Sequence, residues 1–190
     1  MDGLLSLFTA FGLSSSAGLN AYLPLLVVAL LARFTDLVTL EPPWDAMQSG
    51  WTIGVLAVLL LIEMLVDKIP AVDTVNDAIQ TFVRPVAGAI LFAAGSGVIG
   101  DTHPVLAVIC GLVVAGGVHA VKATARPVVT GTTGGLLNPI VSAFEDVLSF
   151  VVAVLSILVP VLGVILLLVI VIWFIRRRQK RRERPSPARW

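Results

Sequence analysis

The sequence predicts an all-α protein with several transmembrane helices, and three features lead to this fold class. Of the 190 residues, 57% are hydrophobic and only 13% are charged, whereas about a quarter of a soluble domain is charged. The mean hydropathy is +0.99, and a soluble chain of this length could not bury so much apolar surface. The apolar residues also fall into runs near the roughly 20 residues that one bilayer crossing needs. These features exclude a soluble globular domain.

The N-terminal third contains the first two predicted crossings. An apolar segment covers residues 4–31, and small and hydroxyl residues at 14–20 interrupt it. The loop at 36–50 follows, with Trp44 inside it and Trp51 just after it, and such tryptophans are typical of anchors at a membrane interface. Residues 51–66 form the second crossing, which ends in a charged group.

The middle third is expected to hold one surface helix and two crossings. Between residues 71 and 84, polar residues recur at a spacing of three or four: Asp73, Asp77, Gln80 and Arg84. Apolar residues follow the same period, which predicts an amphipathic helix with one wet or protein-facing stripe. Its charges favour a position near the membrane surface. Pro85 then begins a third crossing, to about Gly100, and a fourth covers 104–121.

The last third leads into a long apolar helix and a basic tail. Residues 122–146 are mixed in character, and Ser142 and Glu145 have the spacing of a capping box. Residues 147–175 exceed the length of a perpendicular crossing, so tilt or a kink at Pro160 is expected. We therefore divide the chain into a transmembrane core (1–146), a C-terminal transmembrane helix (147–175) and a disordered tail (176–190). About five crossings are expected, with a range of four to six.

The charge distribution predicts the orientation in the membrane. Eight of the thirteen Lys and Arg residues lie in the last fifteen positions, whereas the rest of the chain carries five basic and eleven acidic residues. The positive-inside rule places this tail in the cytoplasm, against anionic lipid rather than nucleic acid. The acidic loop 36–50 prefers the opposite side, yet five plain crossings would put both on one side. An extra crossing or a re-entrant segment would resolve this conflict, and residues 1–20 and 128–146 are the two candidates.

Charged residues within the apolar part of the chain form the candidate site. Glu63 and Asp67 are four residues apart and share a helix face. His119, Lys122 and Arg126 share a face in the same way. Both sets end crossings that run in the same direction, so an acidic and a basic face meet at one depth. They either lock two helices as a structural ion-pair network or bind an ion or a charged headgroup.

Two interrupted segments extend this candidate site. The run 14–20 resembles the run 132–138, and each precedes a proline. Paired interrupted helices point to a transport site, although small residues also serve close helix packing. We therefore add Asn20, Tyr22 and Asn138 to the residues that line the site. A phosphorylated headgroup would instead be held by the cationic residues Lys68, Arg84, Lys122 and Arg126.

The sequence lacks the motifs that several classes of enzymes and cofactor-binding proteins require. The sequence has no nucleotide-binding loop, no metal-ligand spacing and no nucleophile elbow. No cofactor or metal is therefore expected, and an enzymatic role is the less favoured one. Cys110 lies in an apolar run and is interpreted as a small buried hydrophobic residue.

A family resemblance covers about residues 10–150. Its motifs are the segment 18–24, the segment 63–70, the pair Arg84 and Pro85, and the block 122–146 with Asn138 and Pro139. These motifs resemble a bacterial integral-membrane family, domain of unknown function 4126. The resemblance implies a compact polytopic fold, to which the last helix and the tail are added. It implies no activity.

The sequence thus favours a small transporter or channel for an ion or a small charged solute. The alternatives are a membrane enzyme or flippase that handles a lipid headgroup, and a scaffold whose charges only lock helices. Five short helices make a thin wall around a pathway, so a homo-oligomer is expected. The expected location is the inner (plasma) membrane, with several crossings, lipids as partners and the C-terminus in the cytoplasm.

Overall fold

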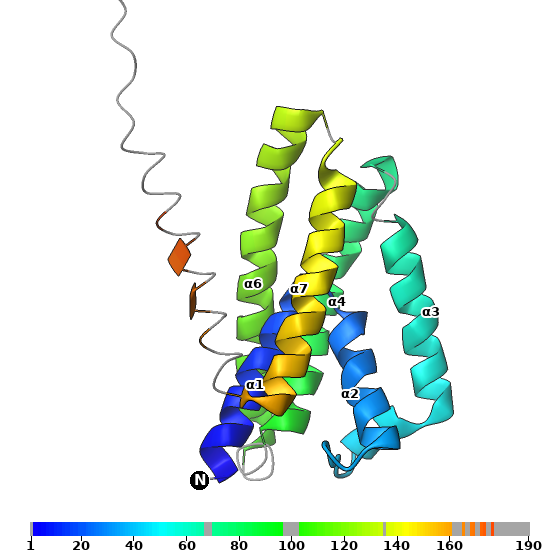
Figure 1. The fold of residues 1–190 in the computed structure, drawn as a ribbon, viewed down its shortest axis with the longest axis vertical. Helices are drawn as coiled ribbons and strands as arrows, with labels where there is room; N and C mark the ends of the chain where they lie inside the picture. Colours follow the sequence, from blue (N-terminus) through cyan, green and yellow to red (C-terminus); the bar gives the residue numbers. More distant parts are fainter. Residues whose placement is uncertain are drawn as a thin grey trace, which may run out of the picture.

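The computed structural model describes residues 2–66, 70–96, 103–134 and 136–160, together with 165, 168–169, 172–173 and 176. The described residues form six α-helices and one short 3-10 helix without any strand, which confirms the all-α class (Figure 1). The elements are α1 (Asp2–Leu19), α2 (Tyr22–Phe34), η1 (Trp44–Gln48), α3 (Gly50–Val66), α4 (Pro70–Gly95), α6 (Pro104–Thr133) and α7 (Asn138–Leu158).

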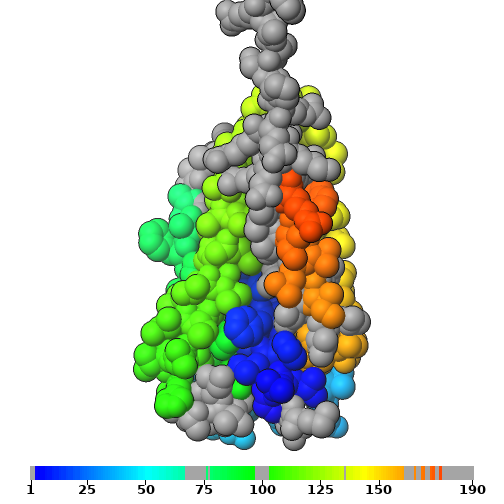
Figure 2. Space-filling model, turned by 90° about the vertical axis from the view of Figure 1, so that its left-hand side faces the viewer, coloured from blue at the N-terminus to red at the C-terminus, as the bar shows by residue number. Residues whose placement is uncertain are grey.

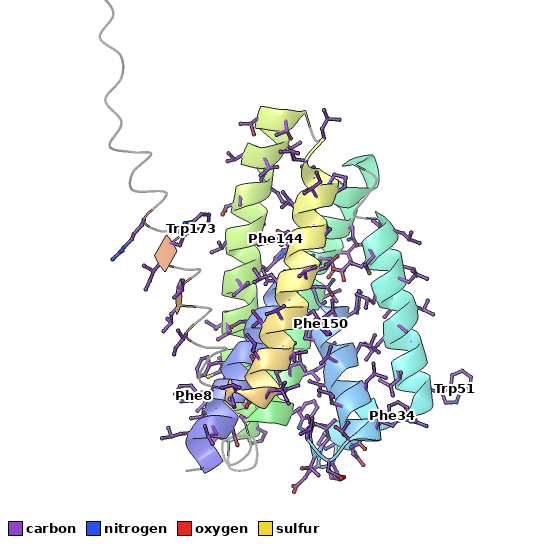
Figure 3. The ribbon with its side chains drawn as sticks, viewed as in Figure 1. Phe8, Phe34, Trp51, Phe144, Phe150 and Trp173 are labelled. Atoms are coloured by element: carbon purple, nitrogen blue, oxygen red, sulfur yellow. The ribbon has the colours of Figure 1, made fainter. Side chains whose placement is uncertain are left out.

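Helix length and surface composition both indicate a membrane protein. Within the described chain, three segments are long and apolar enough to cross a membrane: Ala78–Gly95 of α4, and the whole of α6 and α7. The helices α1, α2 and α3 are apolar but shorter. Large apolar side chains, among them Phe34, Trp51 and Phe144, point away from the bundle (Figure 3). A contiguous apolar exterior of this kind marks a surface that water does not cover.

The helices α1 and α2 form a hairpin that ends inside the bundle. Figure 1 shows both helices in the half of the bundle where the chain begins, with the turn between them near the middle. They have 18 and 13 residues, or about 27 and 20 Å, against a hydrocarbon core of roughly 30 Å. The turn of this hairpin lies at the end of residues 1–20, the first of the two segments proposed for an extra crossing or a re-entrant segment.

The turn of this hairpin lies later in the chain than expected. The serines at 14–16 stay helical, and only Asn20 and Ala21 separate α1 from α2. The Ser15 hydroxyl donates to the Phe11 carbonyl (2.6 Å), while those of Ser14 and Ser16 donate to the Gly111 carbonyl of α6 (3.0 Å) and the Ser149 carbonyl of α7 (2.7 Å). The interruption expected in the run 14–20 thus falls only at its last residue, Asn20, and the serines stay helical because their hydroxyls bond to carbonyls of α1 and its neighbours.

The expected amphipathic helix and third crossing are one helix. Pro85 lies inside the 26-residue helix α4, so the boundary expected there is wrong. A proline in a packed membrane helix is tolerated where neighbouring helices and side chains compensate for the lost hydrogen bond. Gln80 and Arg84 are buried, whereas Ile79 and Phe82 are exposed. Gln80 and Arg84, the two members of the polar stripe whose burial the structure describes, therefore face the protein.

The helices α6 and α7 also begin and end elsewhere than expected. Helix α6 continues through Lys122 and Arg126 to Thr133, and a turn with Gly134 at φ 61° connects it to α7. Helix α7 begins at Asn138 rather than at 147. Ser142 is therefore buried in its interior and cannot cap its start. The kink expected at Pro160 is a full break, because α7 ends at Leu158 and Val159 leaves the helical conformation.

The helices alternate in direction along the bundle (Figure 1). The loop 35–49 and the end of α7 lie at the end where α1 begins, and the Thr9 hydroxyl of α1 donates to the Ser156 carbonyl of α7 (3.0 Å). The turn between α6 and α7 lies at the opposite end. Helix α1 fills the space between α6 and α7, where Figure 2 shows its residues reaching the surface. The tip of the hairpin (residues 19–21) is thus enclosed by longer helices.

Candidate functional site

Ionisable side chains are buried where the hairpin tip meets the longer helices. Glu63 of α3, Arg84 of α4 and His119 of α6 are 2%, 0% and 4% exposed. Lys122 and Arg126 of α6 are 6% and 7% exposed. A single Lys, Arg or Asp at the centre of a membrane helix costs about 2.5–3.5 kcal/mol on insertion scales. Each of these groups therefore needs a partner inside the protein.

Arg84 connects three helices. Its Nη2 donates to Glu63 Oε1 of α3 (3.1 Å), and its Nη1 lies 3.0 Å from His119 Nδ1 of α6. The other ring nitrogen, Nε2, lies 3.1 Å from the Thr81 hydroxyl. We call this group, with the adjacent Gln80 and Tyr22, the Arg84 cluster.

Two polar side chains complete the Arg84 cluster. Tyr22, at the start of α2, lies near the Gln80 side chain and in the electrostatic field of Glu63 and Arg84. Gln80 is one helical turn before Arg84 on the same face of α4. Gln80 Oε1 and Arg84 Nε are both buried and have no hydrogen-bond partner among the described residues. Gln80 thus keeps an acceptor, and Arg84 a donor, that no described hydrogen bond uses.

A second group, the Glu145 cluster, binds the end of α1. The Lys122 ammonium donates to Glu145 Oε2 of α7 (2.8 Å) and to the Leu19 carbonyl, at the C-terminus of α1 (3.0 Å). Arg126 donates to the same carboxylate oxygen at 3.4 Å. A cation at a helix C-terminus is favourable because the last carbonyls are unpaired and carry partial negative charge. Lys122, inside α6, thus joins the end of α1 to the interior of α7.

Asn20 fixes the other half of the hairpin tip. Its Oδ1 accepts hydrogen bonds from the backbone N–H groups of Tyr22 (3.1 Å) and Leu23 (2.9 Å), which caps the start of α2. Its Nδ2 donates to Asp146 Oδ1 of α7 (2.9 Å). The tip is therefore capped at the start of α2 and tied to α6 and α7.

The charged groups of the Arg84 cluster and the Glu145 cluster interact with each other. Lys122 interacts electrostatically with Arg84 as well as with Arg126. Together with Asp146, the described groups comprise three cations and three carboxylates. No group of three or more His, Cys, Asp or Glu in the described parts of the chain could hold a metal.

The structure places the predicted site residues in several groups. Glu63 and His119 are brought together through Arg84, whereas Lys122 and Arg126 take Glu145 as their partner. Asn20 and Tyr22 lie beside these clusters. Asn138 instead exchanges hydrogen bonds with Thr130 (3.0 and 3.2 Å), at the far end of α6. Asp67 and Lys68 lie outside the described residues.

Sequence reasoning missed four members of the site: Gln80, Thr81, Glu145 and Asp146. Gln80 was recognised only as part of a polar stripe. Glu145 was assigned to a capping box, a local role that its long-range partners Lys122 and Arg126 contradict. The signal that could have found it is charge balance, because two buried cations on one helix need a carboxylate on a neighbour.

A cavity of about 370 Å³ lies between the hairpin and the loop end of the bundle. Its walls come from α1, α2, α4, α7 and residues 37–40, and it reaches Leu13, Val28 and Leu91. Leu13 is seven residues before Asn20, or about 10 Å along α1. Buried Ala17, Ala21 and other small residues fill this interval. Close packing of small residues, including the hydrogen-bonded serines 14–16, thus separates the cavity from the charged clusters.

Comparisons with known proteins identify a family but assign no activity to the chain. Neither the curated proteins nor the solved structures include a match to this chain. A model of the family described as domain of unknown function 4126 matches residues 7–180. The match extends beyond the expected residues 10–150, so the last apolar segment and the first residues of the tail are part of the family domain and no addition to it. The chain belongs to the family of domain of unknown function 4126.

Proposed function

We propose that the protein is a small transporter or channel for an ion or a small charged solute, with its site at the hairpin tip. The observation that carries this proposal is the position of Lys122, which links the C-terminus of α1, inside the bundle, to the partly buried Glu145 carboxylate of α7. Helices that end inside a membrane protein are tolerated where they are buried in protein or line a cavity. In many transporters, the ends of such helices form the binding site.

The buried charges also support a functional site over a scaffold. A lock between helices needs one ion pair, and apolar residues of similar size often serve that purpose as well or better. Here six charged side chains and a histidine gather at one level of the bundle. Ionisable groups at this depth are costly and usually mark ion or proton pathways.

The cavity at the loop end supports gated access to this site. It approaches the hairpin tip from the side of loop 35–49 but stops short of the clusters. A solute would reach Lys122 only if the packing around Ala17 and Ala21 opened. We therefore propose that movement of the α1–α2 hairpin controls access.

A phosphate-binding role is less favoured by the contacts of the cations. Arg84 is paired with Glu63, and Lys122 and Arg126 are paired with Glu145. A phosphorylated headgroup would have to displace these carboxylates or add its charge beside them. The ion pairs of these cations with Glu63 and Glu145 instead suit a small ion, which takes the place of one member of a pair when it binds.

The orientation proposal rests on the end at which α7 finishes. Leu158 lies at the end of the bundle that carries the acidic loop 35–49. We propose that the apolar stretch 159–175 crosses once more, on the strength of its sequence. The basic tail would then face the cytoplasm and anionic lipid of the inner membrane, and the acidic loop would face the other side. Self-association remains a proposal based on the small number of helices.

The test is charge movement in liposomes that contain the purified protein. A voltage-sensitive dye reports currents when potassium chloride, sodium chloride or potassium phosphate gradients are applied one at a time. We expect the wild type to move charge in at least one gradient, and Lys122→Met to lose this activity at temperatures where it stays folded. Arg33→Met, which removes an exposed cation, is the matched control and should behave like the wild type. Equal activity of Lys122→Met and the wild type would reject the site.

A further inference from the structure

The contacts of Arg84 fix the protonation state of His119. A guanidinium group only donates hydrogen bonds and stays protonated in proteins. His119 Nδ1, 3.0 Å from Arg84 Nη1, must therefore accept and cannot carry a hydrogen. The ring hydrogen is then on Nε2, which donates to the Thr81 hydroxyl at 3.1 Å. His119 is thus neutral in this arrangement.

Arg84 occupies the two proton-accepting groups of its cluster at once. Nη1 uses the lone pair of His119 Nδ1, and Nη2 uses Glu63 Oε1. A proton on His119 Nδ1 would remove the acceptor and place a second cation beside the guanidinium. A proton on Glu63 would remove the negative charge that holds Nη2. Either protonation therefore weakens one of the two bonds to Arg84.

Gln80 offers Arg84 another acceptor. Its Oε1 is buried, has no partner among the described residues and lies one turn away on the same face of α4. A buried polar atom without a partner costs about 1–3 kcal/mol, so a guanidinium released by Glu63 or His119 gains by turning towards it. Gln80 Oε1 is thus a further acceptor on the same face of α4 as Arg84.

The charged groups around His119 balance one another, so the uptake of one proton changes the net charge of the site. Tyr22 of α2, Glu63 of α3 and Arg84 of α4 face His119 directly or through Arg84. The adjoining charged groups are Lys122 and Arg126 of α6 and Glu145 and Asp146 of α7, while α1 contributes the Leu19 carbonyl. These described groups sum to zero when His119 is neutral. One added proton leaves the site with a net positive charge in an environment that screens charge poorly.

We infer that the ion bound at this site is the proton, taken up by Glu63 or His119 while Arg84 turns from the protonated group to Gln80. This inference rests on the proposed transport function and names its ion. In the uptake step, a proton from water binds a lone pair of Glu63 or of His119 Nδ1. No covalent bond other than this new O–H or N–H bond is formed or broken within the protein. Release to the other side reverses the step.

The first test reads the protonation of the wild-type protein directly. The chain has two histidines, His103 and His119, and His103 is exposed. Nitrogen NMR of histidine-labelled protein in lipid nanodiscs should show His119 near neutral pH with its hydrogen on Nε2, and His103→Gln assigns the signals. Glu63→Gln should shift the titration of His119 by about one pH unit or more, as coupled groups do, and leave that of His103 unchanged. A hydrogen on Nδ1, or an unshifted titration, would overturn the inference.

The second test separates this inference from the proposed function. Liposomes contain a pH-sensitive dye, and a voltage-sensitive dye is used in parallel. A pH response that Glu63→Gln and His119→Gln abolish, and that the matched variants Glu41→Gln and His103→Gln keep, supports the proton. A voltage response without a pH response retains the transport proposal and rejects the proton. Silence of both dyes rejects both.

Discussion

Replacing Lys122 with methionine tests whether the hairpin tip is held as the structure shows. The change keeps a stem of similar size and removes the ammonium that bonds Glu145 (2.8 Å) and the Leu19 carbonyl (3.0 Å). Hydrogen bonds to charged groups contribute about 1.5–3 kcal/mol each, and removing one partner of a buried pair costs about 3–5 kcal/mol. For a chain of this size, each kcal/mol corresponds to roughly 2–4 °C in Tm. We therefore expect a Tm lower by about 6–20 °C.

The assay is tryptophan fluorescence during heating of the detergent-solubilised protein, with Lys122→Arg as the charge-preserving control. Arginine can keep a bond to Glu145, so its loss of Tm should be smaller. A Tm of Lys122→Met within about 2 °C of the wild type, less than one kcal/mol on the same scale, would refute the anchoring role of Lys122. Flux measured below the Tm then distinguishes a site from a lock, because a purely structural pair affects only the Tm.

Three further predictions address the cap, the helix packing and the orientation. Asn20→Ala removes the cap of α2 and the bond to Asp146, so it should cost about 1–2 kcal/mol, seen as a lower Tm; an unchanged Tm would contradict the cap. Gly111→Ala places a Cβ 2.6 Å from Ala89 Cα, whereas Gly117→Ala on the same helix meets nothing within 4 Å. The first should therefore cost about 1–3 kcal/mol and the second should be harmless, and equal effects would argue against the close contact of α4 and α6. Ser186→Cys, in a Cys110→Ala background, should resist labelling by an impermeant thiol reagent from outside intact cells, and successful labelling would overturn the cytoplasmic tail.

Boundaries between helices were the least predictable part of the fold. Pro85 and the serines at 14–16 favour interruption locally, yet both lie inside helices. Each is tolerated because neighbouring helices supply hydrogen-bond partners or close packing that the local sequence does not reveal. Pro160 does end a helix, since the residue before a proline avoids the helical conformation.

The partners of the site residues were harder to predict than the residues themselves. Glu63, Arg84, His119, Lys122 and Arg126 stand out in the sequence because each is an ionisable group in an apolar segment. Spacing along one helix says which of them share a face, but it does not say which helix faces that side. Arg84 therefore emerged only from the structure as the link between Glu63 and His119.

By itself, the sequence determined the membrane class, the all-helical fold and the inward polar groups, because composition and helical period are local properties of the chain. Only the tertiary structure decided where the hairpin turns and what holds its tip. The contacts that do so join Lys122 to Leu19, 103 positions apart, and Asn20 to Asp146, 126 positions apart. Such pairs depend on how the helices pack, since a charge buried away from water is stabilised by whichever opposite charge the packing brings within reach.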